Sequence, residues 1–208
     1  MSRTTILVLA VIVLFLVGVG LALYHLNDAG EREVVNQYRG AAFSFTYPLG
    51  LEIEENSNGA IAIGSTTASG FDSAVNLTIV TPGEIETQSP VASELPPFLS
   101  NLCVTTSPAE RTYCEREERH QAVTTKSGAE AQEYYLVLTR ERAGREPERV
   151  TYGPIYLYIT PAINPDSETD YAVLTVSNSV EAVLAGNADL PLLTRINDSV
   201  TISEEEDR

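Results

Sequence analysis

The sequence predicts an α+β domain, an antiparallel sheet with helices packed on it, preceded by one N-terminal transmembrane helix. After residue 39, short segments of alternating apolar and polar residues dominate, a pattern typical of strands. Two segments, near residues 96–102 and 189–196, carry helix-start signals. Residues 6–23 form an apolar run without a charged side chain. Strands that outnumber helices favour a sheet covered by helices on one face.

The apolar run at residues 6–23 predicts an uncleaved membrane anchor. As a helix it would be roughly 27 Å long, close to the thickness of the hydrocarbon core. Arg3 precedes it and acidic residues follow it, so the positive-inside bias keeps residues 1–5 in the cytoplasm. A cleaved signal peptide is the alternative, and it exports the domain as well. We therefore expect a single-pass cell-membrane protein whose C-terminal domain is extracytoplasmic, in the periplasm or at the cell surface.

The exported part is predicted to begin with a polar stalk at residues 24–38. An extracytoplasmic domain follows at residues 39–203, and residues 204–208 form an acidic tail. Residues 43–47 alternate aromatic and hydroxyl side chains, which predicts a strand that Pro48 stops. Residues 51–55 and 60–64 flank Asn58-Gly59, which favours a hairpin turn. Residues 74–80 predict another strand.

The second half of the domain is predicted to hold two short helices and a long hairpin. Pro96-Pro97 can occupy the first turn of a helix that carries Phe98, Leu99 and Leu102. Residues 130–142 and 149–160 are rich in Tyr, Val, Ile, Leu and Thr and predict a long antiparallel hairpin. Residues 171–177 predict a strand, and Asp189 with Pro191 predicts the start of the second helix. Residues 199–202 predict a closing strand.

The chain is strongly acidic, with 29 acidic against 13 basic residues and a net charge of -16. This charge argues against nucleic acid and anionic lipid as partners. An acidic surface favours solubility, although an acidic face can also recruit cations or a basic partner. Residues 110–150 carry both signs of charge, and we expect their arginines and glutamates to pair across the strands.

Cys103 and Cys114 are the only cysteines. An even number in an exported domain favours a disulfide between them. Free buried thiols remain an alternative. A metal site is the third alternative, because His120 is near in sequence. Two cysteines with one histidine make a poor zinc site, however. No cofactor is expected, because phosphate-binding loops and dinucleotide fingerprints are absent from the sequence.

Candidate catalytic and metal-binding residues are few. His120 lies in a charged segment, without a nucleophile elbow in the sequence, and is interpreted as a surface histidine. Asp166, Glu168 and Asp170 alternate like the ligands of a calcium loop, but the central glycine and the distal glutamate are missing. An acidic turn is the first interpretation of these three residues, and weak calcium binding is the second.

Four tyrosines form a candidate binding face. Tyr152, Tyr156 and Tyr158 are all at even positions of one predicted strand, and Tyr134 lies on its hairpin partner. Exposed tyrosines bind sugars or proteins at a low entropic cost. The alternative is that these rings are packed beneath a helix or loop.

The segment from Tyr38 to Pro48, with its alternating aromatic residues and its Tyr-Pro, resembles the start of the PsbP/Mog1-like superfamily. Three later segments are also similar: residues 128–131, 153–156 and 196–200. Many prokaryotic relatives of unknown function carry a membrane anchor before the same motif. This chain departs from the pattern at residues 49–51, where the family often has a tryptophan. The resemblance implies a sandwich of helices and sheet, with binding or assembly roles and no catalytic residues.

Together these observations predict a membrane-tethered, non-enzymatic extracytoplasmic domain that binds or helps to assemble an envelope component. Its expected partners are the membrane, through the N-terminal helix, and an envelope protein. An exported hydrolase that uses dispersed carboxylates is one alternative. A structural subunit of an envelope membrane complex is the other.

Overall fold

The computed structural model describes residues 35–56, 60–81, 89, 94–107, 109–162 and 169–203. All but Val35 belong to the compact unit Asn36–Arg208. Strands hold 59% of the described residues and helices 14%. The predicted α+β fold, an antiparallel sheet with helices packed on it, is therefore wrong. The domain consists mostly of antiparallel β-structure in two sheets.

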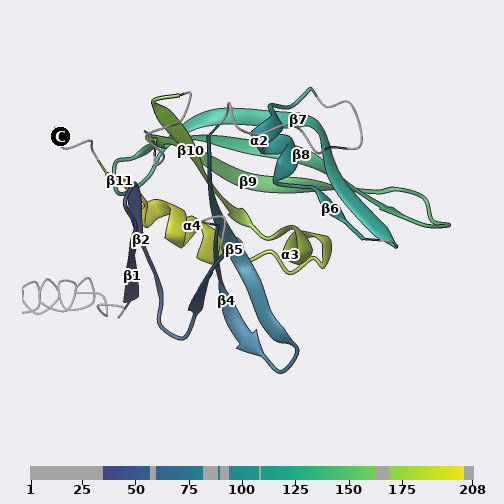
Figure 1. The fold of residues 1–208 in the computed structure, drawn as a ribbon, viewed down its shortest axis with the longest axis horizontal. Helices are drawn as coiled ribbons and strands as arrows, with labels where there is room; N and C mark the ends of the chain where they lie inside the picture. The colour runs from purple at the N-terminus through teal and green to yellow at the C-terminus, as the bar shows by residue number, and fades with distance from the viewer. Residues whose placement is uncertain are drawn as a thin grey trace, which may run out of the picture. The chain divides into compact units, whose positions relative to one another are not determined.

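The described elements are short helices and strands of very different lengths (Figure 1). The strands are β1 (Val35–Arg39), β2 (Phe43–Pro48), β3 (Glu52–Glu55), β4 (Ile61–Thr67), β5 (Gly70–Val80), β6 (Thr105–Thr106), β7 (Glu110–Thr124), β8 (Glu130–Arg142), β9 (Glu148–Pro161), β10 (Tyr171–Asn178) and β11 (Thr201–Ile202). The helices are α2 (Pro97–Asn101), α3 (Val180–Leu184) and α4 (Leu190–Ser199).

The larger sheet has eight strands in the order β3-β4-β5-β10-β9-β8-β7-β6, and the smaller one has three in the order β1-β2-β11. In the larger sheet β10 pairs antiparallel with both β5 and β9, so it lies near the centre. The predicted hairpin of residues 130–142 and 149–160 is present as β8 and β9. The pair predicted on either side of Asn58-Gly59 is present as β3 and β4.

Two features of the fold class were missed. No strand was predicted at residues 110–124, which carry many charged side chains, but they form β7, the longest described strand. The closing segment does not join the main sheet. It pairs with β2 instead, with Thr201 opposite Ser44 and their hydroxyl oxygens 2.7 Å apart. The closing strand therefore belongs to a second sheet, and the helices among the described residues are short, so strands dominate the described part of the domain.

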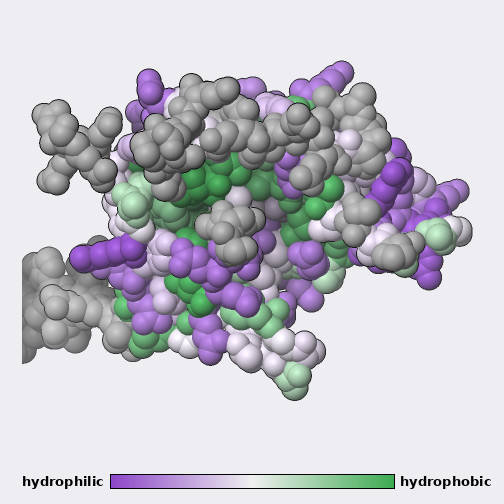
Figure 2. Space-filling model, in the orientation of Figure 1, coloured by the Kyte–Doolittle hydropathy of each residue, from purple (hydrophilic) through white to green (hydrophobic). Residues whose placement is uncertain are grey.

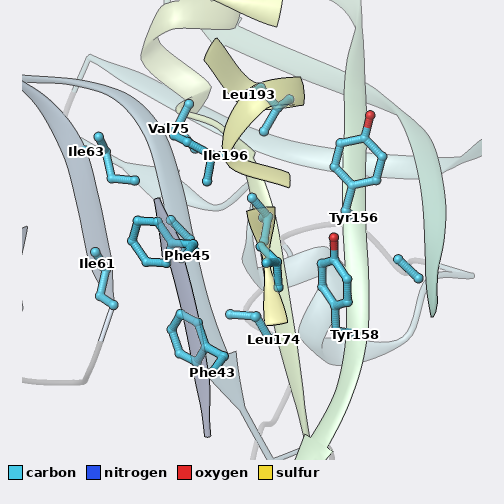
Figure 3. Packing of buried hydrophobic residues seen from close by; sticks show 14 of the residues in the cluster. Phe43, Phe45, Ile61, Ile63, Val75, Tyr156, Tyr158, Leu174, Leu193 and Ile196 are labelled. Atoms are coloured by element: carbon cyan, nitrogen blue, oxygen red, sulfur yellow. The ribbon is translucent and has the colours of Figure 1, made fainter. Parts of the chain in front are cut away.

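One core cluster lies between the two sheets and α4. Phe43 and Phe45 of β2 are buried against strands of the larger sheet, and Leu193 and Ile196 of α4 join them (Figure 3). Tyr38 of β1 stacks on Phe45 with ring centroids 5.1 Å apart. The alternating aromatic residues that predict a half-buried strand thus hold the smaller sheet against the larger one.

The second cluster contains the other set of alternating residues on β9. Ile155 and Leu157 pack with Leu99 of α2 and Val180 of α3, whereas Tyr156 and Tyr158 belong to the first cluster. Successive residues of a strand point to opposite faces. The larger sheet is thus covered on both faces where these elements lie.

The two predicted helix starts are correct. Asp189 caps α4, because its carboxylate accepts a hydrogen bond of 2.9 Å from the backbone N–H of Leu192. Pro97 begins α2 after Pro96, as the double proline predicts. Ser199 of α4 anchors the helix end to β2 by accepting from the N–H of Thr46 at 2.9 Å.

The chain on either side of the domain is described only in part. The last residues of the predicted stalk, from position 35 on, form β1. Within the described residues no helix is long and apolar enough to cross a bilayer. The predicted anchor at residues 6–23 and the acidic tail at residues 204–208 lie outside them.

Candidate functional site

A groove at one end of the larger sheet is the candidate site. Its volume is about 1010 Å³, at the upper end of the range for small-molecule sites. Its wall is formed by the last residues of β7 and β9 and the first residues of β8 and β10. Residues of α2 and β11 complete it. The principal apolar lining residues are Phe98, Tyr134, Leu157, Ile159 and Val173. On the side drawn in Figure 2, apolar residues gather over the larger sheet, with hydrophilic residues around them.

Strand register explains why these residues share one wall. Gln132 of β8 lies opposite Leu157 of β9, and Ile159 of β9 lies opposite Val173 of β10. Directly paired residues of antiparallel strands point to the same face. Leu157 and Val173 are buried, but Ile159 is 65% exposed although it pairs with Val173 of β10. The groove therefore presents a large apolar side chain to solvent.

Glu130 is the described charged residue in the groove lining. It lies opposite Thr124 at the start of the β7–β8 pair and is exposed. Its carboxylate forms no hydrogen bond or ion pair with any residue that the structure describes. Among the described residues, the groove thus combines apolar walls with one negative charge that has no ion-pair partner.

Most other glutamates of the long strands are paired. Four of them contact arginines across strands: Arg111–Glu141 at 2.7 Å, Arg142–Glu110 at 2.6 Å, Arg140–Glu148 at 2.5 Å and Arg149–Glu115 at 3.0 Å. Arg140–Glu148 joins the two strands of the predicted hairpin, as expected, whereas the other three pairs involve β7, which was not predicted as a strand. The hydrogen bond from Arg149 lowers the pKa of Glu115, against a smaller opposing effect of burial.

Two bulges in β7 position part of this network. Glu115 and Glu118 are the extra residues where the β7–β8 register shifts. Both nevertheless reach β9: Glu115 contacts Arg149, and Glu118 accepts a 3.0 Å hydrogen bond from Thr151. Charges and bulges on an outer strand also disfavour pairing with another chain.

The four tyrosines predicted as a binding face do not form one. Tyr152, Tyr156 and Tyr158 are 2%, 7% and 0% exposed. Tyr152 belongs to the cluster beneath α2 and α3, whereas Tyr156 and Tyr158 belong to the cluster beneath α4 and β2. Only Tyr134 is partly exposed, and it lines the groove.

A register shift explains this division of the tyrosines. Tyr134 lies opposite Ile155 and Leu136 opposite Tyr152, so β9 has one more residue than β8 between these two pairs. One extra residue reverses which face the following side chains occupy. The extra residue falls at Gly153-Pro154. Their common even numbering therefore does not place Tyr152 and Tyr156 on one face.

Burial also shifts the acidity of these tyrosines. Burial raises the pKa of Tyr152 to about 12, and Ser177 opposes this by hydrogen bonding to its hydroxyl. Burial likewise raises the pKa of Tyr156 to about 12, helped by the charge of Glu133. The pKa of Tyr158 is raised further, mainly by burial. These phenols stay neutral at physiological pH and act as packing groups.

His120 lies beside the groove residue Tyr134. The two residues are directly paired on β7 and β8, and their rings are stacked with centroids 5.2 Å apart. The Nδ1 atom of His120 lies 2.6 Å from Oε1 of Glu117. No hydrogen bond joins His120 to a serine, threonine or cysteine among the described residues. The prediction of a surface histidine agrees with its 52% exposed side chain.

Cys103 and Cys114 form the disulfide that the sequence predicts, with sulfur atoms 2.04 Å apart. Both residues are fully buried. Cys103 follows α2 and Cys114 belongs to β7, so the bridge ties the helix that carries Phe98 to the sheet. It therefore helps to position one wall of the groove.

The three residues considered for weak calcium binding are not all among the described residues. Asp166 and Glu168 lie outside the described residues, and Asp170 is exposed at the start of β10. In the part of the chain that the structure describes, no group of three His, Cys, Asp or Glu residues could hold a metal ion.

Of the groove residues, Tyr134 was a candidate binding residue in the sequence analysis, and the others were not identified. Ile159 and Glu130 lie in segments whose pattern predicts strands, but a strand pattern does not indicate which end of a sheet stays uncovered. In comparisons with known proteins, neither a family model nor a curated protein matches this chain.

Proposed function

We propose that this chain is a membrane-tethered extracytoplasmic domain that binds an envelope component through the groove at the end of β8 and β9. The observation that supports it best is the groove itself, with the exposed Ile159 beside the buried Leu157 and Val173. Exposed apolar surface in a concave site is typical of ligand or protein binding.

Three further observations support this proposal. The disulfide suits an oxidising compartment outside the cytoplasm. The apolar run at residues 6–23 supports the tether. The resemblance of residues 38–48 to the PsbP/Mog1-like superfamily suggests binding or assembly roles.

Site-specific photocrosslinking in native membranes tests the proposal. A photoreactive amino acid replaces Ile159 in one variant and Leu49 in the other. Leu49 is the matched control, because it is also a large apolar residue, 54% exposed, but does not line the groove. We expect a recurring adduct from position 159 and none from position 49. The same adducts at both positions, or none at either, would contradict the proposal.

Topology needs a separate measurement. Protease added to cells with an opened outer layer but an intact inner membrane should digest the domain. A domain that is protected until the inner membrane is lysed would place it in the cytoplasm and remove the envelope role.

A further inference from the structure

The described lining of the groove couples apolar walls to one carboxylate, that of Glu130, which has no partner among the described residues. From this combination we infer that its ligand is a peptide segment of a partner protein in which apolar side chains stand next to lysine or arginine. This inference rests on the proposed function, because it names the chemistry of the partner that the same groove binds.

The apolar residues of the groove indicate that part of the ligand is apolar. Leu157 and Val173 are buried at the base, Phe98 is partly exposed, and Ile159 projects into solvent. Covering Ile159 removes apolar surface from water, which favours binding by about 25 cal/mol per Å². A ligand must therefore bring apolar side chains to this position.

The negative charge of Glu130 indicates that another part of the ligand is basic. The strands β8 and β9 continue past the Gln132–Leu157 pair to Glu130 and Ile159, so the carboxylate and the apolar side chain stand at the same end of the groove. No lysine or arginine lines the groove in the described part of the chain. The arginines of β7 to β9 that form ion pairs do so with other glutamates. A ligand lysine or arginine can therefore pair with Glu130 without competition from a described basic side chain of the groove.

A peptide suits the site better than a lipid. The net charge of -16 repels anionic headgroups, and no described basic side chain in the groove could hold a phosphate. The lining also contains exposed hydrogen-bonding side chains at Thr124 and Gln132. Such groups can form hydrogen bonds with a peptide backbone, whereas an acyl chain has no hydrogen-bonding groups to offer them.

The test uses the purified full-length chain in phosphatidylcholine nanodiscs, with empty nanodiscs as the blank. Two fluorescent peptide pools share the same randomised Leu, Ile, Val and Phe positions. One pool carries two lysines beside them, and the other carries two glutamates. Fluorescence anisotropy measures the affinity of each pool. We expect the lysine pool to bind about threefold to fivefold more tightly, the range of a partly exposed ion pair.

Two variants assign the effect to residues. E130Q should reduce the preference for the lysine pool, whereas E146Q should leave it unchanged. Glu146 is the matched control, because it is exposed between β8 and β9 but does not line the groove. Ile159→Asn should weaken the binding of both pools, and it should fold because the side chain is exposed.

The outcomes separate this inference from the proposed function. Equal or tighter binding of the glutamate pool, still sensitive to Ile159→Asn, would overturn the basic ligand and keep the groove as a binding site. Binding that Ile159→Asn leaves unchanged, or no binding of either pool, would overturn both. Displacement of the glutamate pool, which anionic vesicles repel, by phosphatidylglycerol vesicles but not by phosphatidylcholine vesicles would assign the groove to anionic lipid and overturn the inference.

Discussion

The hydroxyl of Tyr152 donates a hydrogen bond to the backbone carbonyl of Asn178 across 2.9 Å in the interior of the domain. The same oxygen lies 2.9 Å from Oγ of Ser177, which can donate to it. This contact joins β9 to the end of β10, directly before α3 begins. A ring whose position in the sequence suggested a surface stripe thus joins two central strands.

Replacing Tyr152 by Phe should lower the free energy of unfolding by about 1–2 kcal/mol. The change keeps the ring but leaves the carbonyl of Asn178 and the hydroxyl of Ser177 without this partner in a buried site. Urea unfolding measures the effect. Tyr171→Phe is the control, since that ring is 41% exposed and the change should be close to neutral. Equal stabilities of the two variants would show that the buried hydrogen bonds contribute nothing.

Alkaline pH should destabilise the domain through the same residue. Tyr152 has a folded-state pKa of about 12, above the ordinary value of 10.0. The unfolded chain therefore releases this proton first. Stability is fully present below about pH 10 and falls as the pH rises towards 12, by up to about 1.4 kcal/mol per pH unit for one tyrosine. Urea unfolding across this interval should show a steeper fall for the wild type than for Tyr152→Phe, and parallel curves would contradict the assignment.

Removing the disulfide should lower the free energy of unfolding by about 3 kcal/mol in the chain-entropy model. The Cys103→Ala, Cys114→Ala double variant tests this without leaving a free thiol. Reductant should destabilise the wild type and leave the double variant unchanged. If reductant lowered the stability of both proteins equally, its effect would not come from this bridge.

Gly64 should not tolerate a side chain. A Cβ atom at this position would lie 1.9 Å from the carbonyl oxygen of Asp72, because β4 and β5 approach closely where their register shifts. Gly64→Ala must therefore move backbone atoms, and we expect a loss of about 3 kcal/mol or more. Chemical denaturation measures this. Ser65→Ala, an exposed neighbour, should change stability by less than about 0.5 kcal/mol.

Local chemistry made several elements predictable. Asp189 with Pro191 marks the start of α4, and the paired prolines mark the start of α2. The run of β-branched and aromatic residues in β8 and β9 predicts the long hairpin. Each of these signals depends only on residues a few positions apart, so it can be recognised from the sequence alone.

The missed strand β7 has a different cause. Its charged residues lack the apolar alternation by which strands are usually recognised. In the fold these residues lie on an outer strand, where glutamates and arginines stay in water and pair with β8 and β9. An outer strand needs fewer apolar residues than a central one, so its pattern is weak.

By itself, the sequence determined the acidic character of the chain, its apolar N-terminal run, its paired cysteines and most of its local elements. These properties depend on composition and on neighbours a few positions apart. Only the tertiary structure decided that β11 joins β2 in a second sheet, that an extra residue in β9 separates Tyr152 from Tyr156, and that Glu130 and Ile159 share a groove. Each of these depends on the register between distant strands, where a shift of one residue exchanges the buried and exposed faces.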